Sequence, residues 1–189
     1  MNFITTIDNL NIISIDDSKQ DLIPIEKLKS YLIWRQKEFL EKYDGVRYNT
    51  ENDDYVGIQA ELKNGKPLIA TINSTLLNWD RKDSHPWIVI IEIRYNGQNN
   101  NGLPDNNTLT SLNNFENELM KELKDYDGYL NIGRQTADYC RDIIFACKDF
   151  RKPSKIIHQL LTTKKIGFEI NYNIYKDKYW KSFDRFKPD

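Results

Sequence analysis

The feature that most restricts the fold of this chain is the order in which its hydrophobic periodicity changes between residues 86 and 175. Some runs repeat their apolar residues every three or four positions, as amphipathic helices do, and others are continuously apolar or alternate with period two, as strands do. In chain order they predict a strand at 86–95, a helix at 108–125, strands at 129–135 and 139–148, a helix at 153–163 and a strand at 167–175. The order β-α-β-β-α-β is that of the split βαβ, or ferredoxin-like, arrangement. We therefore predict an α+β fold in which these four strands form one antiparallel sheet with both helices on the same face.

The N-terminal part adds two further elements. The run PIEKLKSYLIWRQKEFLEKY (24–43) predicts a helix, and DYVGIQAELKNGKPLIATINSTL (54–76) predicts two strands around an Asn-Gly turn that could extend the same sheet. Residues 1–23 alternate weakly, so that an extra edge strand and a loose arm both remain open. We expect an N-terminal extension with one helix at 1–50 and a ferredoxin-like domain at 51–189.

Composition limits the classes of function. Lys and Arg total 27 against 28 Asp and Glu, for a net charge of -1, which argues against binding to the phosphate backbone of nucleic acids. The N-terminus lacks a signal-peptide pattern, and no run approaches the roughly 20 apolar residues of a membrane helix. The two cysteines, Cys140 and Cys147, fall on opposite faces of one predicted strand and cannot form a disulfide with each other. We expect free thiols and a cytoplasmic protein without a membrane partner.

The residue types that perform catalysis are sparse. The only histidines are His85, before a strand, and His158, within a short helix, and both favour structural or exposed roles. No metal-ligand spacing and no Gly-rich phosphate loop occurs, so we predict no catalytic residue, no metal site and no cofactor. The aromatic run near the C-terminus predicts a short helix that docks on the domain through Trp180, Phe183 and Phe186.

The hairpin YLNIGRQTADYCRDIIFACKD (129–149) concentrates the most reactive-looking side chains. By strand parity, Arg134 shares a side with Leu130 and Ile132, and Arg141 shares a side with Ile143 and Phe145. A structural interpretation is a lock in which the guanidinium groups pair with acceptors of the same chain. The acceptors we expect are the carboxylates of Asp138, Asp142 and Asp177 or backbone carbonyls, whereas Glu116 is assigned to a charged helix surface. A functional interpretation is an anion site or a contact site for a partner, and both interpretations remain open.

Four short motifs carry a resemblance to a known family. They are NGLP (101–104), the following helix with Glu116, IGRQTADYCRDIIFACKD (132–149) and DKYW (177–180). Over residues 55–186 the chain resembles the bacterial family of unknown function DUF695, whose proteins are similar to the domain type of the ribonuclease E inhibitor RraB. The resemblance implies a ferredoxin-like core and no known enzymatic activity. It marks eight family-pattern positions: Gly102, Pro104, Gly133, Arg134, Thr136, Arg141, Asp177 and Trp180. Tyr139 departs from this pattern, since it stands where a glycine is expected in the turn.

These observations predict a non-catalytic domain that binds another protein, as an inhibitor, a regulator or a toxin-immunity-like protein. The predicted binding residues are Arg134, Thr136, Arg141 and Trp180. One rival hypothesis is a small hydrolase or transferase that holds an anion with Arg134 and Arg141. The other is a nucleic-acid-binding sheet, for which an open, basic and aromatic face would be required.

Overall fold

The computed structural model describes residues 24–97, 100–163 and 167–187, and the chain divides into two compact units, Met1–Val46 and Arg47–Asp189. In the first unit, the short 3-10 helix η1 (Ile25–Lys27) leads into α2 (Leu28–Tyr43), which confirms the helix predicted at 24–43. The alternatives considered for residues 1–23 lie outside the described residues.

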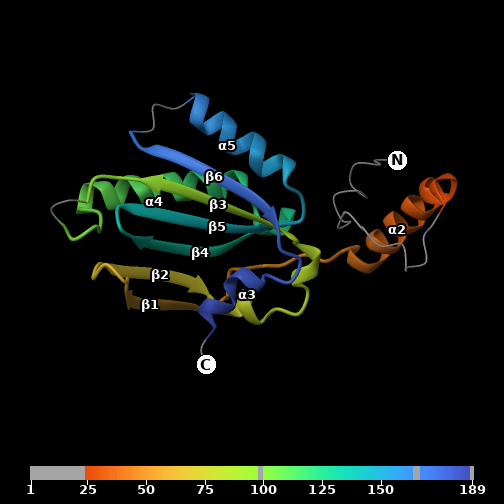
Figure 1. Ribbon diagram of the computed structural model, residues 1–189, viewed down its shortest axis with the longest axis horizontal. Coiled ribbons are helices and arrows are strands. Elements are labelled where there is room, and N and C mark those ends of the chain that lie inside the picture. The colour runs from red at the N-terminus through yellow and green to blue at the C-terminus, as the bar shows by residue number, and fades with distance from the viewer. Residues whose placement is uncertain (1–23, 98–99, 164–166, 188–189) are drawn as a thin grey trace. The chain divides into compact units, whose positions relative to one another are not determined.

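The second unit is built on a six-stranded antiparallel sheet (Figure 1). Its strands are β1 (Tyr55–Glu61), β2 (Pro67–Asn73), β3 (Trp87–Arg94), β4 (Tyr129–Ala137), β5 (Cys140–Cys147) and β6 (Glu169–Lys176). Their order across the sheet is β1-β2-β4-β5-β3-β6. The prediction of a split βαβ sheet is confirmed, since β3 lies between β5 and β6 while β4 and β5 form a hairpin. The predicted hairpin of β1 and β2 extends this sheet at its β4 edge.

Helices α4 (Asn106–Glu122) and α5 (Arg151–Thr163) pack on one face of the sheet, here called the helix-side face (Figure 1). Asp105 caps α4, because its side chain accepts a hydrogen bond from the Thr108 amide. Apolar side chains from both helices and from β3 and β5 form a single core: Val89, Ile91, Ile93, Leu112, Phe115, Leu119, Ile143, Phe145, Ile156 and Ile157 are among its members. Both helices therefore cover the same face, as predicted.

Short helices cover part of the opposite face. They are α3 (Ser74–Asn78), η2 (Lys82–Ser84) and η5 (Lys181–Phe186), and their core includes Ile72, Leu76, Ile88, Leu130, Ile132, Ile144, Trp180, Phe183 and Phe186. The docking of the C-terminal aromatic residues is confirmed. Helix α3 was not predicted, although Asn73 accepts a hydrogen bond from the Leu76 amide, as an N-cap residue does.

A β-bulge in β4 overturns one prediction of side-chain direction. The pairing of β4 with β5 shifts between Asn131 and Gly133, and a bulge of one residue reverses the alternation beyond it. Leu130 and Ile132 therefore face the opposite-face core, whereas Arg134 lies across from Ile143 on the helix-side face. The prediction that Arg134 shares a side with Leu130 and Ile132 is wrong, because the alternation was counted through the bulge.

Candidate functional site

The turn that joins β4 to β5 consists of Asp138 and Tyr139, both at positive φ (45° and 66°). Non-glycine residues rarely adopt this conformation, so surrounding contacts must hold it. The Lys66 ammonium pairs with the Asp138 carboxylate and lies 4.0 Å from the centroid of the Tyr139 ring. The Tyr139 amide donates to the Gly102 carbonyl at 2.9 Å. These neighbours explain how Tyr139 occupies a position where the family pattern predicts glycine.

Arg141 is buried between β5 and α4, with 3% of its surface exposed. Its Nε donates to Thr136 Oγ1 at 3.1 Å, and one terminal nitrogen donates to Asn113 Oδ1 at 2.8 Å. Burial, followed by the charge of Arg134, lowers the pKa of Arg141. The guanidinium is held within the chain, but these two hydrogen-bond acceptors are neutral side-chain oxygens rather than the predicted carboxylates or backbone carbonyls.

Arg134, Arg141 and the residues that their guanidinium groups contact are here called the arginine cluster, and Arg134 forms its ion pair. Its guanidinium donates to Glu116 Oε2 at 3.2 Å, and its own side chain is 38% exposed while that of Glu116 is 6% exposed. The prediction that Glu116 belongs to a charged helix surface is wrong, because the residue lies on the buried side of α4. A signal for this was present in the sequence, because Glu116 stands four residues after Leu112 and three before Leu119, on the apolar stripe itself.

The four predicted binding residues are not brought together. Arg134, Thr136 and Arg141 lie near one another on the helix-side face, whereas Trp180 belongs to the opposite-face core, and its indole donates to the His85 carbonyl. Among the four, Arg134 is the most exposed to solvent, since Thr136, Arg141 and Trp180 are buried. Their role in binding a partner stays a prediction.

The groups that resemble catalytic side chains are buried, except for the partly buried Cys140. Ser84 Oγ lies 2.8 Å from His85 Nδ1, but both residues are buried, and burial lowers the pKa of His85 to about 4. Cys140 and Cys147 are free thiols, and burial raises the pKa of Cys140 to about 12. Within the described residues, no group of three or more His, Cys, Asp or Glu side chains is placed to hold a metal ion. These contacts lend no support to the hydrolase or transferase hypothesis.

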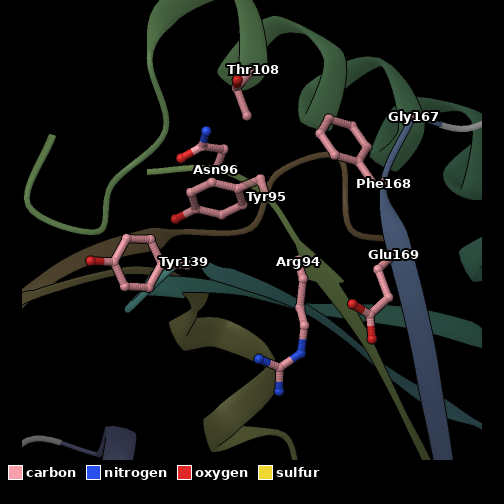
Figure 2. Close-up of a pocket in the computed structure, with 8 residues that line it drawn as sticks. All are labelled: Arg94, Tyr95, Asn96, Thr108, Tyr139, Gly167, Phe168 and Glu169. Atoms are coloured by element: carbon pink, nitrogen blue, oxygen red, sulfur yellow. The ribbon is translucent and has the colours of Figure 1, made fainter. Parts of the chain in front are cut away.

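An open hollow of about 690 Å³ lies where β3 ends and β6 begins (Figure 2). The Tyr95 ring lies between those of Tyr139 and Phe168, Thr108 of α4 lies above them, and the Arg94 side chain extends away from these rings. Arg94 is the register partner of Glu169 on β6, so the two formal charges at this hollow balance. None of the four predicted binding residues lines it.

On the helix-side face, the β1–β2 hairpin carries exposed side chains that lie outside the core beneath α4 and α5. This face of the hairpin carries Tyr55, Gly57 and Gln59 on β1 and Ile69 and Thr71 on β2, and we call it the hairpin ledge. Tyr55 is 49% exposed and Ile69 is 41% exposed, and neither belongs to the core beneath α4 and α5. Thr71 and Ile69 are the register partners of Arg134 and Thr136, so the ledge adjoins the arginine cluster. Sequence reasoning missed it, because its residues carry no catalytic chemistry.

Comparison with known proteins assigns a family. The model of a "Family of unknown function (DUF695)" matches residues 60–186. No curated protein matches the chain, and no solved structure matches it. None of the described helices is long and apolar enough to span a membrane.

Proposed function

We propose that this chain, which belongs to the DUF695 family, is a non-catalytic domain that binds another protein by adding an extended segment of that partner to β1. In this proposal it acts as a bacterial cytoplasmic inhibitor, regulator or toxin-immunity-like protein, by occupying a surface of its partner. The free thiols support a reducing compartment, and the resemblance to the RraB type of domain is what suggests inhibition.

The observation that carries the proposal is the exposure of β1 at the edge of the sheet. This strand is the outer strand of the sheet, and six of its seven residues are exposed. Its pairing with β2 is continuous over the whole strand, without a bulge. The outward backbone N–H and C=O groups of such a strand can hydrogen-bond an incoming strand, which is how peptides bind by β-augmentation.

The composition of β1 supports this use. Natural edge strands are commonly protected by Lys, Pro, bulges or inward-pointing charges, and β1 (YVGIQAE) contains no Lys and no Pro, with Glu61 at its end as the charged residue. Tyr55 and Val56 are exposed apolar residues on its two faces. The opposite edge strand, β6, begins with Glu169 and ends with Lys176. Of the two edges, β1 is the less protected.

The arginine cluster supports the ledge as a contact surface rather than a reaction centre. Arg141 donates hydrogen bonds to Thr136 and Asn113, and Arg134 pairs with Glu116 at the border of the ledge. A partner segment paired with β1 would meet Tyr55 and Gln59 on the helix-side face, whereas Arg134 on β4 lies three strand spacings from it. Shape and backbone hydrogen bonds would then supply affinity, and the side chains of the ledge would supply specificity.

Site-specific photo-crosslinking in cells tests the proposal. A photoreactive phenylalanine analogue replaces Tyr55 on β1 or, as a matched control, the exposed Tyr172 on β6. We expect one partner protein to be crosslinked at position 55 and not at 172. The partner is then purified, and its affinity is measured for the wild type, for Gly57→Lys on the ledge and for Asn173→Lys on β6.

Gly57 suits this test because a Cβ at that position would meet no other atom. Gly57→Lys should weaken binding at least about tenfold with an unchanged melting temperature, since a charge on an edge strand opposes strand addition. Asn173→Lys should bind as the wild type does. Equal crosslinking at 55 and 172, crosslinks from 55 to residues 1–46 of the same chain, or unaltered affinity of Gly57→Lys would overturn the proposal.

A further inference from the structure

A half-enclosed pocket of about 350 Å³ is lined in part by residues 49–51, four residues before β1 begins. It lies between the loop at 49–51 and the C-terminal part of α4, and its buried lining includes the side chains of Leu123 and Tyr129. Met120 and Tyr126 are exposed at its rim. An apolar floor with a flexible methionine at the rim is typical of pockets that receive a single apolar anchor side chain from a protein partner.

Carboxylates surround this pocket and the beginning of β1. Glu51 and Asp125 line the pocket, and Asp53 and Asp54 directly precede β1. In the part of the chain that the structure describes, none of the four forms an ion pair. The side chains of Asp53 and Asp125 accept hydrogen bonds from neutral groups of Tyr48, Asn73 and Thr50. Among the described residues that line this pocket, Lys124 is the one cation, against the carboxylates of Glu51 and Asp125, so negative charge prevails there.

Nearby carboxylates add to the effect of burial on the pKa of two tyrosines. Burial and then the hydrogen bond and charge of Asp53 raise the pKa of Tyr48 to about 12. The pKa of Tyr55 is raised by burial and by the charges of Asp53, Asp125 and Glu116, against a hydrogen bond with Asn73 that lowers it. The charges of the pocket therefore reach the first residue of β1. A segment that lies along β1 would pass through this field.

Resting on the function proposed above, we propose that the partner segment that adds to β1 is cationic and carries one large apolar side chain, which fills this pocket. Lys or Arg residues of the segment lie opposite Glu51 and Asp54, which have no ion-pair partner to displace. The apolar anchor contacts Leu123 and Tyr129, and Met120 closes over it. This occupant matches both the charge and the polarity of the surface.

Selection from a random 12-residue peptide library displayed on phage tests the inference on the full chain. We expect enrichment of peptides that combine Lys or Arg with one Trp, Phe, Leu or Ile. Synthetic copies of the enriched peptides are then titrated by fluorescence anisotropy. The charge variant is Glu51→Gln/Asp54→Asn, and its matched control, Asp80→Asn/Glu169→Gln, removes two negative charges at exposed positions outside the pocket and outside β1.

The charge variant should raise the peptide Kd about fivefold at low salt, and the difference should shrink as salt screens the attraction. The matched control should stay within about twofold of the wild type. Met120→Trp, which narrows the mouth of the pocket, should raise the Kd at least about tenfold. Leu109→Trp, at an exposed site in the first turn of the same helix, should leave the Kd unchanged, and all four variants should keep the wild-type melting temperature.

The outcomes separate this inference from the proposed function. The cationic segment is overturned if the enriched peptides are acidic or uncharged, or if they bind the charge variant and its control equally. If Gly57→Lys still weakens the binding of these peptides, β1 remains the contact site. Peptides whose binding Gly57→Lys does not weaken overturn the proposed function together with the inference. Equal Kd values for Met120→Trp and Leu109→Trp overturn the anchor pocket.

Discussion

The sheet contains two hairpins that differ in how much of their surface is used internally. The β4–β5 hairpin lies inside the sheet, and its polar side chains are engaged by other parts of the chain: Arg141 by Asn113, Arg134 by Glu116 and Asp138 by Lys66. The β1–β2 hairpin lies at the edge, and its outer strand is exposed over nearly its whole length. The hairpin with the more reactive-looking sequence is therefore the one with less surface to offer a partner.

This difference shows why conspicuous residues are a poor guide to function in this chain. Charged side chains near a sheet interior must find partners, because an unpaired buried charge strongly destabilises the fold. Tyr, Val and Ile at an edge need no partner, and they remain available for binding. The predictions below test whether the interior hairpin stabilises the fold and whether the edge hairpin is available for binding. They are given in order of decreasing expected effect.

The largest effect is expected from Gly133→Ala in the bulge of β4. Gly133 has φ of 141°, and a Cβ there would collide with the backbone carbonyl of Thr71 on β2. We expect a loss of about 4 kcal/mol or more in the free energy of unfolding, measured by urea denaturation. The matched control is Gly57→Ala on β1, which has open space around the added methyl group and should change stability by less than about 1 kcal/mol. Similar stabilities for the two variants would show that the bulge is not fixed as described.

Leu119→Ala should have the next largest effect, and its neighbour Met120→Ala should have little. Leu119 is completely buried on the core-facing side of α4, whereas Met120 is 42% exposed at the rim of the pocket lined by residues 49–51. Removing the buried side chain should lower the free energy of unfolding by about 3 kcal/mol, and removing the exposed one by about 0.5 kcal/mol. Comparable losses in thermal and denaturant unfolding would mean that the orientation of α4 has been assigned incorrectly.

The fold could be predicted from the sequence because it depends on periodicity. The apolar stripe of α4 and the continuous apolar run of β3 are strong local signals, and the short connection between β4 and β5 leaves antiparallel pairing as the only choice. The helix α3 was missed, since its five residues are too few to show a helical period.

The candidate site was harder to predict, because it depends on local exceptions to the regular alternation of apolar and polar side chains. The bulge at Asn131 and Gly133 moved Arg134 to the other face of the sheet. Glu116 was taken as a surface charge, although it occupies an apolar stripe position and accepts from Arg134. The exposure of β1 follows from its place at the end of the strand order, which no local pattern in the sequence specifies.

Arg141→Lys should destabilise the protein by about 2 kcal/mol. A lysine carries one ammonium group and cannot reproduce the two directed hydrogen bonds that the guanidinium makes with Thr136 and Asn113. Asn113→Ala, which removes one of the two acceptors, should show part of this loss. An Arg141→Lys protein that melts with the wild type would defeat the assignment of Arg141 as a structural residue, and the interior hairpin would then have to be tested as a binding site.

The smallest effect on stability is expected from Arg134→Lys. Its side chain is 38% exposed, and ion pairs that solvent reaches contribute little, so the free energy of unfolding should fall by less than about 0.5 kcal/mol. A lysine also keeps the positive charge beside Glu116, and this spares the buried carboxylate from losing its counter-ion. Arg134→Met removes that charge and should destabilise more, because Glu116 is then left buried without it.

Binding decides what Arg134 contributes to the edge hairpin. If the partner segment pairs with the outer edge of β1 as proposed, Arg134 lies three strand spacings from it, so Arg134→Lys should bind the partner within about twofold of the wild type at a nearly unchanged melting temperature. Gln59→Ala, on the outer strand of the same ledge, provides a comparison that leaves the arginine intact. If Arg134→Lys instead weakens binding several-fold without a loss of stability, the partner lies across the face of the ledge, and pairing with the edge of β1 is overturned.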